Sequence, residues 1–264
     1  MATVTVQRLC ADLREPLLLE VLVELPAEAI AVPAVDVHRP GMVLMGFAGD
    51  FLPRRIQVVG ESEMAFLSTL APEQQRTAID RVLALEPPVI FIAADQPVPG
   101  ESLELARSRG IPLVRTALPA VEFMAELTHH LERAFAPRTE VHGTLCDVYG
   151  VGLLFTGRSG IGKSECALDL IERGHRLVAD DIVEITRTGE DVLIGRYRDL
   201  LRHHLEIRGV GVIDVQAIFG IRAIRMQKRV EVEVQLQQWD DNVDYERMGL
   251  ENRYTEILGT SIPQ

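Results

Sequence analysis

One short stretch of the chain has the residue types and the spacing of a phosphate-binding loop. Residues 157–164 match the pattern G-x-x-x-x-G-K-[ST] in full. Glycines let such a backbone turn inward, so that several N–H groups point at one anion, and the start of the following helix adds partial positive charge. Lys163 supplies an ammonium for the β- and γ-phosphates, and Ser164 supplies a hydroxyl for Mg²⁺. The predicted phosphate-binding residues are Gly157, Arg158, Ser159, Gly160, Ile161, Gly162, Lys163 and Ser164.

Two neighbouring carboxylates follow the next apolar run. The helix predicted after the loop ends near Arg173-Gly174, and residues 176–179 then form an apolar strand that leads into Asp180 and Asp181. Carboxylates at a strand end beside a phosphate-binding loop hold Mg²⁺ or the attacking nucleophile. Adjacent strand residues face opposite ways, so the two are expected to have different tasks. A solvated turn after the strand is the alternative.

A third stretch combines glycines, apolar residues and charges. Residues 203–215 read His-His-Leu-Glu-Ile-Arg-Gly-Val-Gly-Val-Ile-Asp-Val and carry Glu206, Arg208 and Asp214. Glycine-interrupted apolar sequence with three charges is unusual for plain core. Physical reasoning alone leaves a functional and a structural interpretation equally open.

The elements before residue 136 predict an α/β domain. Helical spacing over 74–85 is followed by a short apolar run at 89–93, which is typical of a strand buried on both faces. A second helix (103–109), strand (111–114) and helix (119–135) follow, and this alternation predicts parallel pairing. We also expect a strand over 42–47. Two further strands, 144–149 and 151–155, lie beyond Ala136-Pro137-Arg138-Thr139, the predicted linker.

Composition limits the function classes. The 264 residues carry a net charge of −12, with 12 basic and 19 acidic side chains in residues 1–140 and 15 and 20 in the rest. This even acidity argues against a nucleic-acid-binding face, which needs clustered positive charge. No apolar run is long enough to cross a membrane and no signal peptide is recognisable, so we expect a cytoplasmic protein.

The cysteines and histidines do not predict a metal site. Cys10, Cys146 and Cys166 are widely spaced without a C-x-x-C pair, so they are interpreted as reduced structural thiols. The His129-His130 and His203-His204 pairs are adjacent residues, which do not share a helix face.

Taken together, these motifs resemble bacterial HPr kinase/phosphorylase. The resemblance spans nearly the whole chain, and its most specific part is the combination of the phosphate-binding loop with the stretch around Glu206. The segments that carry it are 37–41, 55–60, 142–144, 157–164, 174–181, 205–214 and 247–250.

The resemblance implies a two-domain α/β protein. It implies an N-terminal α/β domain over 1–136 and a P-loop kinase domain over 137–264 that resembles phosphoenolpyruvate carboxykinase. Such enzymes use ATP and Mg²⁺ to phosphorylate a serine of HPr, the phosphocarrier protein of the sugar phosphotransferase system. They reverse the reaction by phosphorolysis, in which inorganic phosphate releases pyrophosphate. Members assemble as homohexamers.

The resemblance also implies roles for individual residues at matching positions. Lys163 and the loop would bind nucleotide phosphates, and Ser164 and Glu206 would hold Mg²⁺. Asp181 would accept the serine proton and return it in the reverse reaction, as microscopic reversibility requires. His142 and Arg247 would complete the active site.

The chain departs from the family at its end. In the family, the Ile-Pro near residue 263 precedes a Pro-Gly-Arg loop and terminal helices, whereas this sequence stops at Gln264. We therefore expect a shortened catalytic domain in which phosphorolysis is impaired more than nucleotide binding. The alternatives are a nucleotide-binding regulatory module without transfer activity and a small-molecule kinase.

Overall fold

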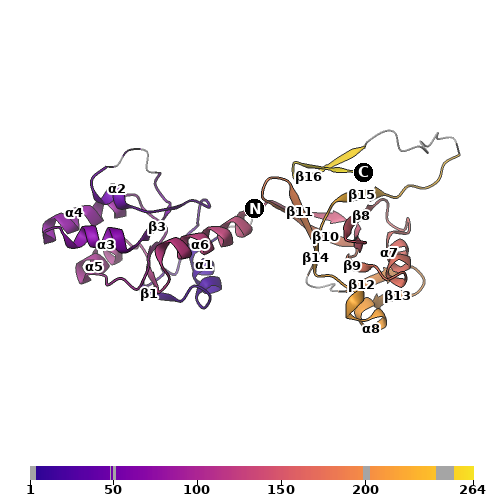
Figure 1. Cartoon of the computed structure of the whole chain (residues 1–264), viewed down its shortest axis with the longest axis horizontal. Coiled ribbons are helices and arrows are strands. Elements are labelled where there is room, and N and C mark those ends of the chain that lie inside the picture. The colour runs from indigo at the N-terminus through magenta and orange to yellow at the C-terminus, as the bar shows by residue number, and fades with distance from the viewer. Residues whose placement is uncertain (1–3, 48, 50–51, 199–202, 242–252) are drawn as a thin grey trace. The chain divides into compact units, whose positions relative to one another are not determined.

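The computed structural model describes residues 4–47, 49, 52–198, 203–241 and 253–264, which divide between two compact units, Met1–Phe135 and Ala136–Gln264 (Figure 1). The first unit is a five-stranded sheet with helices on both faces. Its strand order is β1-β5-β4-β3-β2; strands β2 to β5 are parallel, and β1 is antiparallel to β5. The strands are β1 Leu19–Val23, β2 Val37–His38, β3 Ile56–Val59, β4 Ile90–Ile92 and β5 Leu113–Thr116.

Two separate apolar clusters cover the two faces of this sheet. Alternate strand residues point to opposite faces, so Val58 and Phe91 pack against the helices α1 and α6, while Val59 and Ile92 pack against α2 to α5. The near-continuous apolar strands predicted from the sequence are thus explained by burial on both sides. The helices are α1 Val6–Leu13, α2 Gly41–Leu44, α3 Glu61–Ser68, α4 Pro72–Leu83, α5 Gly100–Ser108 and α6 Ala120–Phe135.

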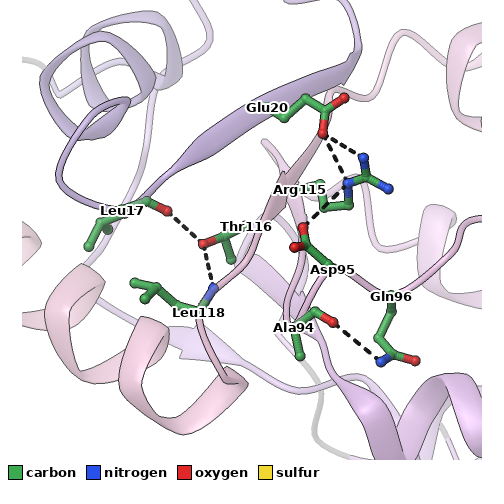
Figure 2. A network of polar contacts seen from close by, with 8 residues as sticks. All are labelled: Leu17, Glu20, Ala94, Asp95, Gln96, Arg115, Thr116 and Leu118. Atoms are coloured by element: carbon green, nitrogen blue, oxygen red, sulfur yellow. Dashed lines mark hydrogen bonds and ion pairs between the residues drawn. The ribbon is translucent and has the colours of Figure 1, made fainter.

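The antiparallel edge strand β1 is tied to β5 by polar side chains (Figure 2). Arg115 lies opposite Glu20 and donates to its carboxylate at 2.6 Å, and it approaches Asp95 at 3.8 Å. The hydrogen bond that Arg115 donates to Glu20 raises the pKa of the Arg115 guanidinium. Below this pair, the buried Thr116 hydroxyl donates to the Leu17 carbonyl at 2.6 Å. These contacts fix the register of the edge strand.

One predicted element of the first unit is wrong. Residues 42–47 were expected to form a strand, but the structure has the one-turn helix α2 there, starting directly after Pro40. Val43 and Leu44 are buried in the cluster on the α2–α5 face of the sheet. A short apolar run does not distinguish a strand from a buried helix turn, and tertiary packing decides here.

The second unit contains mostly strands. A mixed sheet in the order β15-β8-β7-β9 packs against an antiparallel sheet in the order β14-β11-β10-β6. Two antiparallel hairpins, β12-β13 and β16-β17, complete the strands among the described residues of this unit. The strands are β6 Arg138–His142, β7 Thr144–Val148, β8 Val151–Thr156, β9 Arg176–Ala179, β10 Ile182–Thr188, β11 Val192–Tyr197, β12 His204–Ile207, β13 Gly211–Asp214, β14 Gln227–Arg229, β15 Val232–Gln235, β16 Tyr254–Ile257 and β17 Thr260–Pro263.

Two clusters again cover the two faces of the mixed sheet. Leu145 and Leu154 face the antiparallel sheet and the β16-β17 hairpin, whereas Cys146 and Phe155 face α7 (Lys163–Glu172), β12-β13 and α8 (Val215–Phe219).

The predicted linker is shorter than expected, because Arg138 and Thr139 already pair with β10. Among the described residues, no helix has the length and apolarity needed to cross a membrane.

Candidate active site

The strand directions in the mixed sheet gather the predicted site at one edge. Strands β8 and β9 both run antiparallel to β7, which lies between them, and β15 runs parallel to β8. The carboxyl ends of β8 and β9 therefore meet the start of β7. This places the phosphate-binding loop, the Asp180-Asp181 pair and Thr144 at the same edge, although they lie far apart in the sequence.

The phosphate-binding loop leads directly from β8 into α7. Gly157, Gly160 and Gly162 have φ angles of 136°, 75° and 108°, in the left-handed region that favours glycine. A Cβ on Gly157 would also lie 2.5 Å from the carbonyl oxygen of Leu236. The sequence of the loop is thus explained by its backbone: the chain must both turn sharply and pass close to the neighbouring strand.

Lys163 begins α7 and curls back over the loop. Its Nζ donates to the carbonyl oxygens of Gly157 at 3.1 Å and Arg158 at 3.2 Å. Among the other loop positions, Arg158 and Ser159 are exposed and Ile161 is half-buried. An ammonium group and the open N–H groups at the start of a ten-residue helix lie at the same place, so the local potential favours an anion.

Asp180 is the centre of the polar network at this edge. The residue is 8% exposed, and its carboxylate accepts from the Thr144 hydroxyl at 2.6 Å and from the Ser164 hydroxyl at 2.9 and 3.0 Å. It also lies 3.3 Å from the backbone nitrogen of Glu206, which donates to it. One buried carboxylate thereby joins β7, α7, β9 and β12. Charge-assisted hydrogen bonds of this kind hold a site more firmly than neutral ones.

Asp181 differs from its neighbour in exposure and in backbone. It has a φ of 66°, and the Ile182 nitrogen donates to the Asp180 carbonyl at 2.8 Å across it, so it is the central residue of a γ-turn. The Asp181 carbonyl accepts from the Gly143 nitrogen at 3.1 Å. Asp180 is buried and Asp181 is exposed, so the two side chains do lie in different surroundings. The cause is the tight turn at Asp181 and not the alternation of side chains along a strand, which the sequence had suggested.

The β12-β13 hairpin brings Glu206 and Arg208 to the loop. Glu206 pairs with Val212 across the hairpin, so the side chains of Glu206 and Val212 lie on the same face. Both of these side chains are exposed. Leu205 and Ile207 face the other way into the core. Arg208 reaches the phosphate-binding loop: one guanidinium nitrogen lies 3.8 Å from where a Cβ on Gly160 would be.

The remaining predicted site residues are His142 and Arg247. His142 ends β6 opposite Ile182 and is exposed, which puts it beside the Asp181 turn. Arg247 lies outside the described residues, as does the rest of the 247–250 segment.

The two cysteines nearest the site differ in reactivity. Burial, reinforced by the nearby Asp180, Cys166 and Asp147, raises the pKa of the Cys146 thiol to about 12. Cys166 is exposed in the first turns of α7. Cys146 is therefore a neutral core residue at physiological pH.

Three residues at this edge had been assigned no specific role from the sequence. Thr144 and Asp180 take part in the buried network, and Arg208 approaches the loop. The sequence held a partial signal for two of them: Asp180 adjoins Asp181, and Arg208 stands in the glycine-interrupted stretch. Thr144 belongs to a segment that carries the family resemblance, but nothing in its local sequence indicated its role, because its partner is 36 positions away.

Comparisons with known proteins identify the same family in both units of the chain. Residues 4–131 match the family model described as "HPr Serine kinase N terminus", and residues 133–264 match "HPr Serine kinase C-terminal domain". A relative named HPr kinase/phosphorylase from Chloroherpeton thalassium is 49% identical over 228 residues, 86% of this chain and 67% of that protein.

Other relatives carry the same name. One from Caldicellulosiruptor bescii is 42% identical over 93% of this chain and 79% of its own length, and one from Bacillus mycoides is 44% identical over 86% and 74%. A solved structure, the Hpr(Ser) kinase/phosphatase from Coxiella burnetii, is 32% identical and covers 47% of this chain and 76% of its own, with a TM-score of 0.43. With both family models matched and relatives of this identity, the chain belongs to the HPr kinase/phosphorylase family.

Proposed function

We propose that the chain is an ATP-dependent protein-serine kinase and phosphorylase whose protein substrate is HPr. Family membership supports this assignment, and one structural observation carries it furthest. Asp180 joins the serine of the phosphate-binding loop to Thr144 and to the backbone of Glu206, directly beside the exposed carboxylate of Asp181. Phosphate-binding groups and a candidate proton acceptor therefore occupy one edge of one sheet.

In this proposal, the loop and Lys163 hold the nucleotide phosphates. Phosphoryl transfer depends on positioning and charge neutralisation more than on covalent catalysis by the protein. The loop N–H groups and the Lys163 ammonium supply both, and Arg208 adds a second cation near Gly160. Arg247 is proposed, from the family alone, to neutralise further charge on the transferred group.

The oxygen donors present suit Mg²⁺. Mg²⁺ prefers oxygen ligands and is usually held by one or two carboxylates together with substrate phosphates. The Ser164 hydroxyl and the Glu206 carboxylate would hold it, with the Asp180 carboxylate in hydrogen-bond contact with that hydroxyl. When bound, the ion would neutralise charge on the phosphate oxygens.

Asp181 is the proposed base. Its carboxylate takes the proton of the acceptor serine as the serine oxygen bonds to the γ-phosphorus and the bond from that phosphorus to the β-phosphate oxygen breaks. In the reverse direction, an oxygen of inorganic phosphate bonds to the phosphorus of phosphoserine. The serine oxygen leaves with the proton from Asp181, and pyrophosphate is formed. His142, beside the Asp181 turn, is proposed to orient the acceptor.

Two wider properties are proposed from the family. We infer that the chain assembles as a homohexamer and acts in the cytoplasm. Its molar mass in solution, measured by light scattering at several concentrations, tests the assembly: a mass close to that of one 29.3-kDa chain at every concentration would contradict it.

Intact-mass analysis of HPr after incubation with the chain and Mg-ATP tests the function. The expected product is HPr with one added phosphoryl group on a serine. Lys163→Ala should abolish the addition, because the loop then lacks its ammonium. Arg173→Ala is the control, since it removes an exposed cation at the opposite end of α7. No added mass despite binding of ATP would indicate a regulatory module without transfer activity.

A further inference from the structure

A buried carboxylate lies behind the phosphate-binding loop, on the face of the mixed sheet opposite α7. Glu233 of β15 is 9% exposed. Its Oε1 accepts from the Thr156 hydroxyl at 2.7 Å, and its Oε2 accepts from the side-chain amide of Gln264 at 2.9 Å. Burying a carboxylate is costly unless its oxygens are hydrogen-bonded, and here each oxygen has a donor.

Thr156 connects this carboxylate to the loop. It is the last residue of β8, directly before Gly157, and it is itself only 9% exposed. Its carbonyl accepts from the Leu236 nitrogen at 2.8 Å, and Leu236 supplies the carbonyl that approaches Gly157. Backbone and side chain of Thr156 are therefore both held by β15, at the point where the chain leaves the sheet.

The other oxygen of Glu233 connects to the β16-β17 hairpin. Gln264 follows β17, and its backbone nitrogen donates to the Arg253 carbonyl at 2.8 Å. Ile257 and Ile262 of the hairpin lie in the same apolar cluster as Leu154 of β8. A continuous set of contacts thus runs from the hairpin through Glu233 and Thr156 to the first residue of the loop.

We propose that Glu233 is a positioning residue for the nucleotide: through the Thr156 hydroxyl it fixes where β8 ends and the phosphate-binding loop begins. Loop N–H groups bind phosphate well only when they are aimed in advance, so a loosened first residue weakens binding. Glu233 does not itself touch the phosphates in this scheme. The inference rests on the proposed nucleotide site and extends it to a residue outside the motif.

The test is equilibrium binding of Mg-ATP to the full chain by titration calorimetry, with thermal unfolding followed in parallel. Thr156→Val removes the hydroxyl with almost no change of shape, and we expect ATP binding about 3- to 10-fold weaker, the range of one hydrogen bond. Thr156→Ser keeps the hydroxyl and should restore binding to within about twofold. Glu233→Ala should weaken binding at least as much as Thr156→Val.

Thr260→Val is the matched control. Thr260 is 4% exposed in β17, and its hydroxyl has no hydrogen-bond partner among the described residues, so the same chemical change is made there without touching the loop. Unchanged ATP binding by Thr156→Val would overturn the inference. Equal weakening by Thr156→Val and Thr260→Val, in step with lost thermal stability, would overturn it too. A wild-type chain that binds no ATP would instead refute the proposed function.

Discussion

The backbone of Asp181 is in a conformation that costs energy. A non-glycine residue at a φ of 66° in a γ-turn is strained by about 1–3 kcal/mol, and such strain persists where the surroundings enforce it. Here the surroundings are the hydrogen bonds from Gly143 and Ile182 across the turn. The turn leaves the Asp181 side chain exposed, while its neighbour Asp180 is buried.

Asp181→Asn separates the chemistry of this residue from its structural role. Asn tolerates the left-handed region as well as Asp does, so the unfolding free energy should change by no more than about 0.5 kcal/mol. Loss of the base should lower kcat for phosphorylation of HPr by about 10²- to 10⁴-fold. Urea unfolding and steady-state kinetics check the two parts, with Asp181→Gly as a control that relieves strain and also lacks the base. Full activity of Asp181→Asn would assign the proton to another group.

Alkylation of the cysteines reports on the same edge. Cys166 is exposed, three residues after Lys163, whereas burial raises the pKa of Cys10 to about 11 and that of Cys146 to about 12. The thiolate is the reactive form, so iodoacetamide at pH 7.5 should label Cys166 well before the other two. Mg-ATP should slow the labelling of Cys166, as peptide mass analysis can show. Equal labelling with and without Mg-ATP would place the nucleotide away from the start of α7.

At the residue scale, the sequence predicted the parts whose chemistry is local. The spacing of the loop is itself the signal, because one backbone turn and one helix start create the anion site. Asp180 is different: its role depends on hydroxyls 16 and 36 positions away and on a backbone N–H of β12. Without those contacts, adjacent carboxylates cannot be told apart by type or spacing.

At the scale of the elements, β8 lies between β7 and β15 in the mixed sheet and is also held by polar side chains. On the side of β14 and β15, the Glu231 carboxylate accepts from the Gly152 nitrogen of β8 and from the Lys228 ammonium, both at 2.7 Å. Burial acts to raise the pKa of Glu231, but the hydrogen bonds from Lys228 and Gly152 outweigh it, and the pKa is lowered. A carboxyl group whose pKa is lower in the folded state stabilises the fold above its unfolded pKa.

Glu231→Gln should therefore destabilise the second unit in a pH-dependent way. The side chain is 31% exposed, so we expect a loss of about 1 kcal/mol at pH 7, discounted for solvent screening. The difference from wild type should shrink as the pH falls below about 4, where the wild-type carboxyl becomes protonated as well. Urea unfolding between about pH 2.5 and 7.5 measures it, with the exposed Glu190→Gln as the control for losing one charge. A difference independent of pH would show that packing, not ionisation, is responsible.

An element could be predicted where its local sequence determines its conformation, and could not where contacts with neighbouring elements determine it. The strand at 89–93 and the helix at 119–135 follow from local pattern and match β4 and α6 within a few residues. The strand predicted at 42–47 was wrong, because a short apolar run fits either element and the contact between α2 and α4 selects the helix. The strand order of the mixed sheet, which creates the site, has no local signature at all.

At the scale of the whole molecule, the site and the core that supports it belong to one unit. The two apolar clusters of the second unit contain only residues beyond 136, and the two of the first unit contain only residues up to 135. Every described residue of the proposed site lies between 142 and 208. Each unit thus has its own core, which is the physical requirement for folding alone.

A chain of residues 136–264 expressed alone should then fold and bind Mg-ATP within about threefold of the full-length affinity. The reason is that the loop, Asp180 and Glu206 are all positioned by strands of this unit, so removing residues 1–135 leaves their hydrogen bonds intact. Circular dichroism tests folding, and titration calorimetry tests binding. Residues 1–135 serve as the control, which should fold without binding ATP. A folded 136–264 chain that binds ATP tenfold more weakly would mean that the first unit contributes about 1.4 kcal/mol to the nucleotide site.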